Sequence, residues 1–162
     1  MHDAIWTTLD ALCDPEIPVV SLRELGILRE VRTAADGVTE VVITPTYSGC
    51  PAMGQIEDDV HAALARSGLA ARVVTQLAPA WTTDWISESA REKLRAFGIA
   101  PPPRGGPQPL TFSRRKPPRE AVACPRCGST HTTETSPFGS TACKAMYRCL
   151  DCLEPFDLFK SY

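Results

Sequence analysis

Two C-x-x-C pairs near the end of the chain limit most strongly what this sequence can fold into. They are Cys124-Pro125-Arg126-Cys127 and Cys149-Leu150-Asp151-Cys152, with 21 residues between them. A tight turn lets both thiolates of a pair point at one ion, and two such turns brought together by a hairpin complete a tetrahedral site with Zn–S bonds of about 2.3 Å. A segment of about 40 residues is too small to fold on an apolar core alone. Metal binding is therefore predicted to drive its folding.

The composition supports metal binding over disulfides but leaves the metal open. Five of the seven cysteines lie in the last 39 residues, in a chain without a recognisable secretory signal. Zinc is the first expectation, and four thiolates also suit one iron or an iron–sulfur cluster. A thioredoxin-like redox pair is a further alternative, although that motif is single and lies between a strand and a helix. Cys143 is interpreted as a small buried residue or as an extra ligand.

Short β-like runs around the cysteines predict a zinc-ribbon β domain over residues 124–162. Residues 130–135 and 141–148 are expected to form a hairpin, and residues 155–159 to add a third strand. The aromatic residues of this segment are interpreted as its core: Tyr147, Phe156 and Phe159.

The pattern of residues 1–98 predicts an α+β fold, a small α-β-β-α-β-α sandwich. Strand, helix and strand in succession favour a right-handed crossover with parallel pairing, whereas an Asp-Gly turn predicts an antiparallel hairpin, so the sheet should be mixed. The expected elements are a helix over about 3–13, a hairpin of 27–33 with 38–44, a helix from Pro51 to Gly68, a strand over 72–78 and a helix over 86–97.

Residues 99–123 are expected to form a proline-rich, basic linker between these domains. They hold seven of the fifteen prolines and the run Arg114-Arg115-Lys116, a composition that cannot form a packed core. The basic run is interpreted as a solvated hinge rather than as a nucleic-acid arm.

Charge and hydropathy exclude other classes of protein. Residues 1–98 carry 8 basic and 14 acidic side chains, and residues 121–162 carry 4 of each, so we expect no nucleic-acid partner. No apolar run approaches the roughly 20 residues that span a bilayer. Asp3 and Asp10 stand where a signal peptide would be basic. A soluble cytoplasmic protein without a membrane partner is expected.

A lone cysteine precedes the predicted middle helix. In the loop from Thr46 to Pro51, Cys50 follows a glycine and precedes a proline that suits the first turn of a helix. The positive end of a helix favours a thiolate, as a metal ligand or a nucleophile requires. The alternative is a small buried residue. No histidine is placed to serve as a base, so Cys50 is expected to bind metal transiently rather than to cleave bonds.

Other residues are candidate neighbours of Cys50. Asp14 and Glu16 are paired carboxylates beside prolines, which turn formation and helix capping also explain. Trp81 follows the third predicted strand at the same sheet end, either as a ligand contact or as a rim over the core. Thr46 begins the cysteine loop. The sequence has no G-x-G-x-x-G, P-loop, G-x-S-x-G or H-E-x-x-H motif, so a conventional enzyme is disfavoured and no catalytic residue is predicted.

Together, several stretches resemble the metal-sulfur cluster assembly family, which includes SufT-type and eukaryotic cytosolic iron–sulfur targeting factors. This resemblance covers residues 1–98 and rests on Asp14–Pro18, Leu25–Ile27, Thr46–Pro51 and the segment around Trp81. The ribbon, with its stretches 143–149 and 154–157, looks like the PaaD branch, the D subunits of bacterial phenylacetyl-CoA epoxidases.

The resemblance implies an accessory role in aerobic phenylacetate degradation. In that system a di-iron oxygenase epoxidises the ring of phenylacetyl-CoA, and an iron–sulfur flavoprotein reductase supplies electrons. The D subunit is not the oxygenase and is thought to assist iron or iron–sulfur assembly in its partners. The implied cofactors are zinc or iron in the ribbon and transient iron or an iron–sulfur cluster at Cys50. The implied partners are the epoxidase subunits and, in a homodimer, a second copy. The alternatives are a structural subunit of the oxygenase complex and a nucleic-acid-binding ribbon protein.

Overall fold

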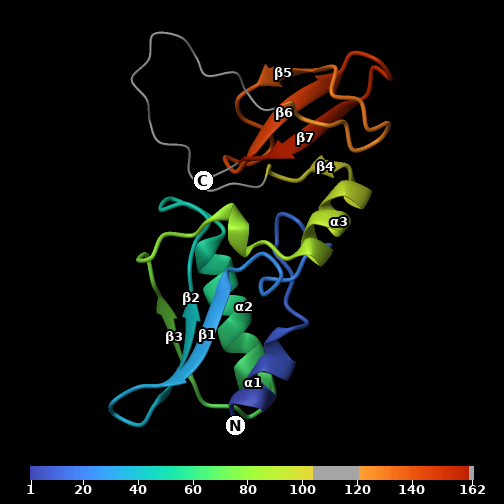
Figure 1. Cartoon of the computed structure of the whole chain (residues 1–162). Coiled ribbons are helices and arrows are strands. Elements are labelled where there is room, and N and C mark those ends of the chain that lie inside the picture. The colour runs from blue at the N-terminus through green and yellow to red at the C-terminus, as the bar shows by residue number, and fades with distance from the viewer. Residues whose placement is uncertain (104–120, 161–162) are drawn as a thin grey trace. The chain divides into compact units, whose positions relative to one another are not determined.

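The computed structural model describes residues 1–103 and 121–160 (Figure 1). The chain divides into two compact units, Met1–Trp81 with Trp85–Ala90 and Thr82–Asp84 with Arg91–Tyr162. The division falls inside the 3-10 turn η1 (Thr83–Trp85) and inside helix α3 (Glu88–Phe97). Most of the expected linker, including its basic run, lies outside the described residues.

The first unit contains the predicted mixed sheet. Strand β1 (Leu28–Thr33) pairs antiparallel with β2 (Thr39–Ile43), and β2 pairs in parallel with β3 (Arg72–Thr75). Gly37, with φ +82°, forms the predicted turn between β1 and β2. The parallel pairing places the crossover helix α2 (Met53–Arg66) between β2 and β3, as expected.

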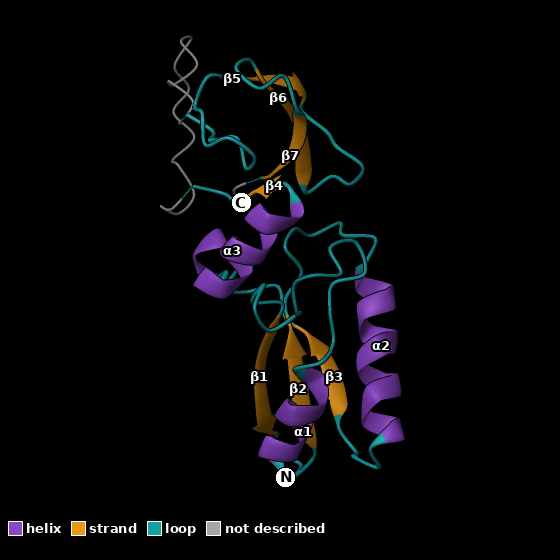
Figure 2. Ribbon diagram, turned by 90° about the vertical axis from the view of Figure 1, so that its right-hand side faces the viewer, coloured by secondary structure: helices purple, strands orange, loops and turns teal. Residues whose placement is uncertain are grey.

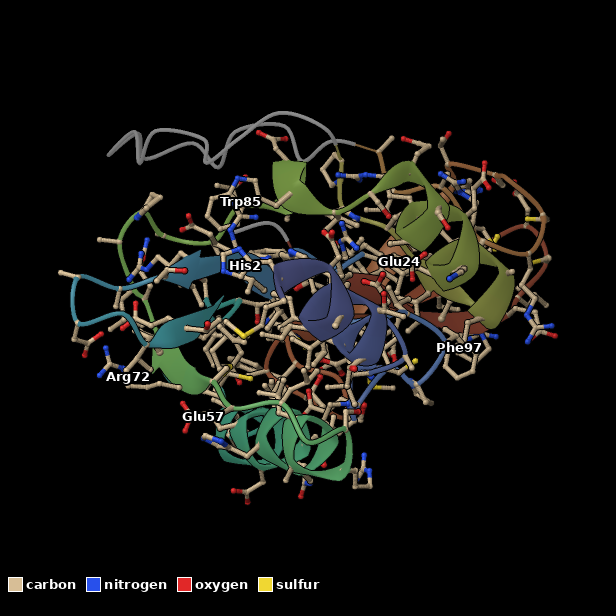
Figure 3. All side chains as sticks on the ribbon, turned by 90° about the horizontal axis from the view of Figure 1, so that it is seen from below. His2, Glu24, Glu57, Arg72, Trp85 and Phe97 are labelled. Atoms are coloured by element: carbon tan, nitrogen blue, oxygen red, sulfur yellow. The ribbon has the colours of Figure 1, made fainter. Side chains whose placement is uncertain are left out.

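Two helices pack side by side on this sheet, α1 (His2–Leu9) beside β1 and α2 beside β3 (Figures 2 and 3). The apolar stripe predicted for α2 is buried and consists of Ile56, Val60, Ala63 and Leu64. Helix α1 ends at Leu9, before the expected end near residue 13. It ends there because the following backbone pairs with residues 20–22: the Leu22 N–H donates to the Leu12 carbonyl at 2.9 Å.

A capped turn closes the core next to the sheet. Ser21 and Glu24 cap each other's backbone N–H groups, with the Glu24 N–H 3.2 Å from Ser21 Oγ. Gly26 follows with φ +74°, and a Cβ there would lie 2.7 Å from Trp85 Cβ. Only glycine fits this position, because it combines a left-handed backbone with a close approach to Trp85.

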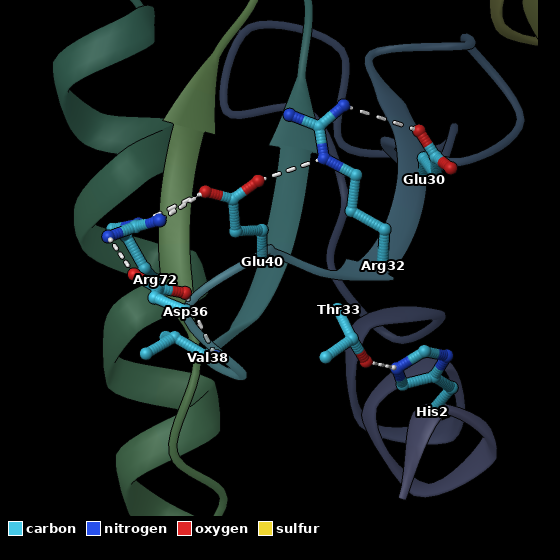
Figure 4. A network of polar contacts seen from close by, with 8 residues as sticks. All are labelled: His2, Glu30, Arg32, Thr33, Asp36, Val38, Glu40 and Arg72. Carbon is cyan, nitrogen blue, oxygen red and sulfur yellow. Dashed lines mark hydrogen bonds and ion pairs between the residues drawn. The ribbon is translucent and has the colours of Figure 1, made fainter.

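An ion-pair network spans the three strands of the first sheet (Figure 4). Glu40 on β2 is 7% exposed, and its carboxylate accepts hydrogen bonds from Arg32 Nε at 2.8 Å and Arg72 Nε at 3.1 Å. Hydrogen bonds from Arg72 and, to a smaller extent, from Arg32 lower the pKa of Glu40 from its usual value. Glu40 therefore joins the central strand to both neighbours as a carboxylate.

The second unit contains a four-stranded sheet in the order β4-β7-β6-β5. The predicted hairpin is β5 (Thr132–Ser136) with β6 (Lys144–Cys149), and the predicted third strand is β7 (Pro155–Phe159), antiparallel to β6. The three aromatic residues assigned to its core, Tyr147, Phe156 and Phe159, are buried.

Strand β4 (Ile99–Ala100) was not expected. These two residues, predicted to begin the linker, pair in parallel with β7 and are 4% and 2% exposed. Arg91, which is 5% exposed, donates from its guanidinium to the carbonyls of Pro102 at 2.6 Å and Thr83 at 2.7 Å. Residues 99–102 therefore belong to the packed second unit, because apolar burial and a satisfied buried arginine hold them there.

Within residues 1–103 and 121–160, no helix combines the length and apolar character that crossing a bilayer requires.

Candidate functional site

The four cysteines of the two C-x-x-C pairs converge in the second unit. The Sγ atoms of Cys124, Cys127, Cys149 and Cys152 all lie within 4.8 Å of one another. The distance is 3.8 Å between Cys124 Sγ and Cys152 Sγ and 3.6 Å between Cys127 Sγ and Cys149 Sγ. A tetrahedral ion with bonds of about 2.3 Å requires sulfur–sulfur distances of about 3.8 Å. The donor set therefore fits one four-coordinate metal ion.

Each pair lies in a tight turn that its own backbone closes. In the first, the Gly128 N–H donates to the Cys124 carbonyl at 2.9 Å, and Gly128 has φ +76°. In the second, which begins at the end of β6, the Cys149 N–H donates to the Glu154 carbonyl at 3.0 Å, and Leu153 has φ +65°. The sheet brings these two turns together.

Backbone N–H groups polarise the cysteine sulfurs unequally. The Cys152 N–H donates to Cys149 Sγ, and this bond, with one from Asp151 N–H, lowers the pKa of Cys149 to about 7 against the effect of burial. The Glu154 N–H acts the same way on Cys152, but burial and the adjacent thiols outweigh it and raise the pKa of Cys152 to about 12. Four crowded thiols cannot all ionise at neutral pH without a cation, and a bound metal would supply that charge.

Cys143 lies just before β6 and is separate from this cluster. Its side chain is buried, and its Sγ lies 3.0 Å from Thr141 Oγ1. The structure therefore does not bring the candidate extra ligand into the four-cysteine group.

Cys50 occupies the loop between β2 and α2 and is partly buried. Helix α2 begins at Met53 with Ala52 as its N-cap, so the helix starts later than the expected position at Pro51. Burial raises the pKa of Cys50, the Ala52 N–H opposes that effect, and the negative charges of Glu16 and Asp14 raise the pKa further. The N–H at the helix start favours the thiolate as expected, but desolvation and two carboxylates outweigh it, so the net pKa is raised rather than lowered.

The structure brings two of the four candidate neighbours into the electrostatic surroundings of Cys50. Asp14 Oδ1 accepts the backbone N–H groups of Glu16 at 2.8 Å and Ile17 at 2.9 Å, so the capping role expected for Asp14 is present as well. Thr46 begins the same loop and is partly buried. Trp81 is 4% exposed, and its indole N–H donates to the Leu25 carbonyl at 2.9 Å, which makes it a core residue.

Sequence reasoning missed a polar cluster beside the four cysteines. Asp151, between the cysteines of the second pair, accepts hydrogen bonds from the Ser129 hydroxyl and lies 3.0 Å from His131 Nδ1. The hydrogen bond from Ser129 and, to a smaller extent, the one from His131 lower the pKa of Asp151. The only sequence signal is the position of Asp151 inside a C-x-x-C turn, because its partners depend on how the two turns meet.

Comparison with known proteins separates the same two parts. A family model described as an iron-sulfur cluster assembly protein matches residues 2–76, and a model described as the PaaD zinc beta ribbon domain matches residues 109–160. An Escherichia coli (strain K12) protein named as the D subunit of 1,2-phenylacetyl-CoA epoxidase is 48% identical over 157 residues, covering 96% of this chain and 90% of that protein.

Two further similarities concern the first part of the chain. An Fe-S protein maturation auxiliary factor of Porphyromonas gingivalis (strain ATCC BAA-308 / W83) is 33% identical over 95 residues, which is 57% of this chain and 90% of that protein. The crystal structure of a domain of unknown function, DUF59, from Bacillus anthracis matches with a TM-score of 0.51 and 27% identity, covering 57% of this chain and 90% of that one.

Proposed function

The chain belongs to the family of the D subunit of 1,2-phenylacetyl-CoA epoxidase, and on that premise we propose that it is a non-catalytic accessory protein that helps to mature the iron-containing partners of that epoxidase. One observation carries this proposal: the chain joins a four-cysteine cluster to a separate unit in which one of the two cysteines, Cys50, lies under the influence of two carboxylates. A stable metal site and a weak one on the same chain suit a protein that receives a metal and passes it on.

The ribbon is the stable site in this proposal. Its four sulfurs would fill every position around a tetrahedral ion and would leave no open position for substrate, which is typical of a structural zinc site. Iron suits four thiolates too. Metal analysis with an absorption spectrum separates the two, because zinc thiolates are colourless above 400 nm. The ribbon is proposed to dock the partner that receives iron.

Cys50 is the exchangeable site. With its pKa raised, Cys50 carries a proton at neutral pH, so iron must displace that proton to bind the sulfur. One thiolate with carboxylate oxygens from Asp14 or Glu16 would hold iron more weakly than four thiolates do. Weak binding favours transfer to a partner whose site is complete.

A structural subunit of the oxygenase complex is the second candidate function, and the name of the E. coli relative as a subunit favours it. The two differ in stoichiometry. A structural subunit co-purifies with the active epoxidase in a fixed ratio, whereas a maturation factor is absent from the active complex or present in less than equimolar amounts.

The test of the maturation role is Cys50→Ala in the full chain, with Cys13→Ala as the control because Cys13 is an exposed cysteine of the same unit. We expect Cys50→Ala to keep its fold and its ribbon metal, while the iron content of the oxygenase partners and growth on phenylacetate both fall. Normal growth and normal iron content in that variant would reject Cys50 as the functional thiol and move the function to the ribbon.

A further inference from the structure

One carboxylate connects the segments that carry the two cysteine pairs. Asp151 belongs to the second turn, and its two oxygens contact two residues that follow the first turn: Oδ2 accepts from the Ser129 hydroxyl, and Oδ1 lies 3.0 Å from His131 Nδ1. The His131 N–H also donates to Ser129 Oγ at 3.0 Å. We call these three residues, Ser129, His131 and Asp151, the turn clamp.

The backbone of the same residues contacts the cysteines. The Ser129 N–H donates to Cys127 Sγ, and the Asp151 N–H donates to Cys149 Sγ. The Ser129 carbonyl accepts the Cys124 N–H at 2.8 Å. The side-chain bond between Ser129 and Asp151 therefore joins two residues whose N–H groups contact ligand sulfurs of different turns, Cys127 Sγ and Cys149 Sγ.

A second backbone contact strengthens the connection. The His131 carbonyl accepts the N–H of Leu150, the other residue inside the second C-x-x-C turn, at 2.8 Å. Residues 129–131 thus contact the second turn through both backbone and side chains.

We infer that Asp151 is a positioning residue that locks the two cysteine turns together and slows the release of the ribbon metal. This inference rests on the metal binding proposed above. Release is easier when one turn can move away from the other, and that movement breaks the clamp. Groups that orient metal ligands typically change metal affinity by about 10- to 100-fold when removed.

The clamp is well suited to act on release rather than on stability. The side chains of His131 and Asp151 are 66% and 55% exposed, so they fill no part of the core. Exposed polar pairs contribute little to folding in general. The metal-loaded variants should therefore keep four-thiolate coordination while losing metal faster, a combination that unfolding of the ribbon would not produce.

The experiment measures zinc transfer from the full chain, loaded with zinc, to a colorimetric chelator, 4-(2-pyridylazo)resorcinol. Asp151→Asn replaces one acceptor oxygen by a donor, and Ser129→Ala removes one hydroxyl. Glu134→Gln is the charge-matched control, since Glu134 is an acidic residue of β5 whose carboxylate accepts from the Tyr147 hydroxyl. We expect Asp151→Asn to release zinc about tenfold faster, Ser129→Ala to change in the same direction, and the control to match the wild type.

A double variant and cobalt spectra complete the test. If the two side chains act through one contact, Asp151→Asn with Ser129→Ala should release zinc no faster than the faster single variant. Cobalt loaded into each variant should keep the spectrum of four-thiolate coordination. If Asp151→Asn fails to load zinc, the release rate of Ser129→Ala alone tests the inference. That substitution removes only one oxygen atom and is the milder of the two.

The outcomes distinguish this inference from the function on which it rests. Zinc release from Asp151→Asn and Ser129→Ala at the control rate overturns the clamp and leaves the metal site intact. A wild-type chain that binds no metal, or that keeps it after Cys127→Ser, overturns the four-cysteine site and the clamp together.

Discussion

The first unit buries the apolar faces of two helices against a three-stranded sheet, whereas two of the six residues in the main core cluster of the second unit are the candidate ligands Cys124 and Cys149. Removing a metal from the second unit would leave the buried thiols of Cys124 and Cys149 in this core without the ion that joins the two turns. Among the described residues, the core of the first unit does not depend on a metal, since aliphatic side chains fill most of its interior. The two units should therefore fail under different perturbations.

The cysteines differ in the same way. In the second unit, four sulfurs meet at the distances of a closed metal site, and backbone N–H groups support them. In the first unit, burial and then two carboxylates raise the pKa of Cys50. The comparison teaches that a thiol close to a helix start is not necessarily acidic, because burial and nearby carboxylates can outweigh the N–H groups of the helix end.

The largest effect is expected from Cys127→Ser, which removes one of the four ligands. Structural zinc sites of small domains contribute about 10–16 kcal/mol of binding free energy. We expect the variant to lose its metal and the amides of β5, β6 and β7 to lose protection from hydrogen exchange, while β1 to β3 stay protected. The exposed Cys13→Ser is the control. Equal protection of the ribbon in both variants would contradict the dependence on metal.

Gly26→Ala should destabilise the first unit alone. The substitution forces a side chain into a left-handed backbone, at about 1–2 kcal/mol, and against Trp85, at about 1–3 kcal/mol for overpacking. We expect the free energy of unfolding to fall by about 3 kcal/mol. Urea unfolding followed by tryptophan fluorescence measures it, because Trp6, Trp81 and Trp85 all lie in this unit.

Gly37→Ala provides the matched control for that prediction. Gly37 also has a positive φ, +82°, but nothing lies within 4 Å of an added Cβ. The free energy of unfolding should fall by about 1 kcal/mol, from the cost of the left-handed backbone conformation alone. Equal effects of the two substitutions would show that the contact with Trp85 carries no cost, and a change in ribbon metal content would show that the units are coupled.

Local patterns predicted much of the fold. The buried stripe of α2 follows from apolar spacing, the β1–β2 turn follows from Asp36-Gly37, and the ribbon hairpin follows from the cysteine spacing. Each of these signals acts over a few residues, so the sequence alone contains it. The four-cysteine cluster was predictable for the same reason.

Features that depend on tertiary contacts were not predictable. Strand β4 has only two residues, Ile99 and Ala100, and exists because β7 offers a free edge. The end of α1 is set by pairing with residues 20–22, which no helical pattern reveals. The raised pKa of Cys50 comes from burial and from carboxylates about 35 residues away in the sequence. In each case the deciding partner is distant along the chain.

A smaller effect, confined to the first unit, is expected for Glu40→Gln and depends on pH. Hydrogen bonds from Arg72 and Arg32 lower the pKa of Glu40 below the value of about 4.3 for an unfolded chain. The carboxylate therefore contributes stability above about pH 4.3, and this contribution is lost as the pH falls through its folded pKa. We expect Glu40→Gln to unfold at lower urea than the wild type at pH 7, with a smaller difference at pH 3.5.

Glu30→Gln is the control for this pH dependence. Glu30 belongs to the same network, but its carboxylate lies 3.7 Å from Arg32 and its side chain is 56% exposed. Exposed pairs of this kind contribute little, so this variant should follow the wild type at both pH values. If the difference in unfolding urea concentration between Glu40→Gln and the wild type stayed constant from pH 7 to pH 3.5, the stabilising role of the Glu40 carboxylate would be contradicted.

The smallest effect tests the contrast between the two kinds of cysteine. The charge of Glu16 helps to raise the pKa of Cys50, so Glu16→Gln should lower that pKa and increase the thiolate fraction at pH 8. Glu16 is the better target than Asp14, because Asp14 Oδ1 also holds two backbone N–H groups of the turn. We expect Cys50 to react with iodoacetamide faster in this variant, because a lower pKa increases the thiolate population at a given pH. Mass spectrometry of the peptide that contains Cys50 gives the rate, with Glu30→Gln as the control. An unchanged rate would mean that burial alone keeps Cys50 protonated, and the carboxylates would then lose their place in the proposed exchange of iron.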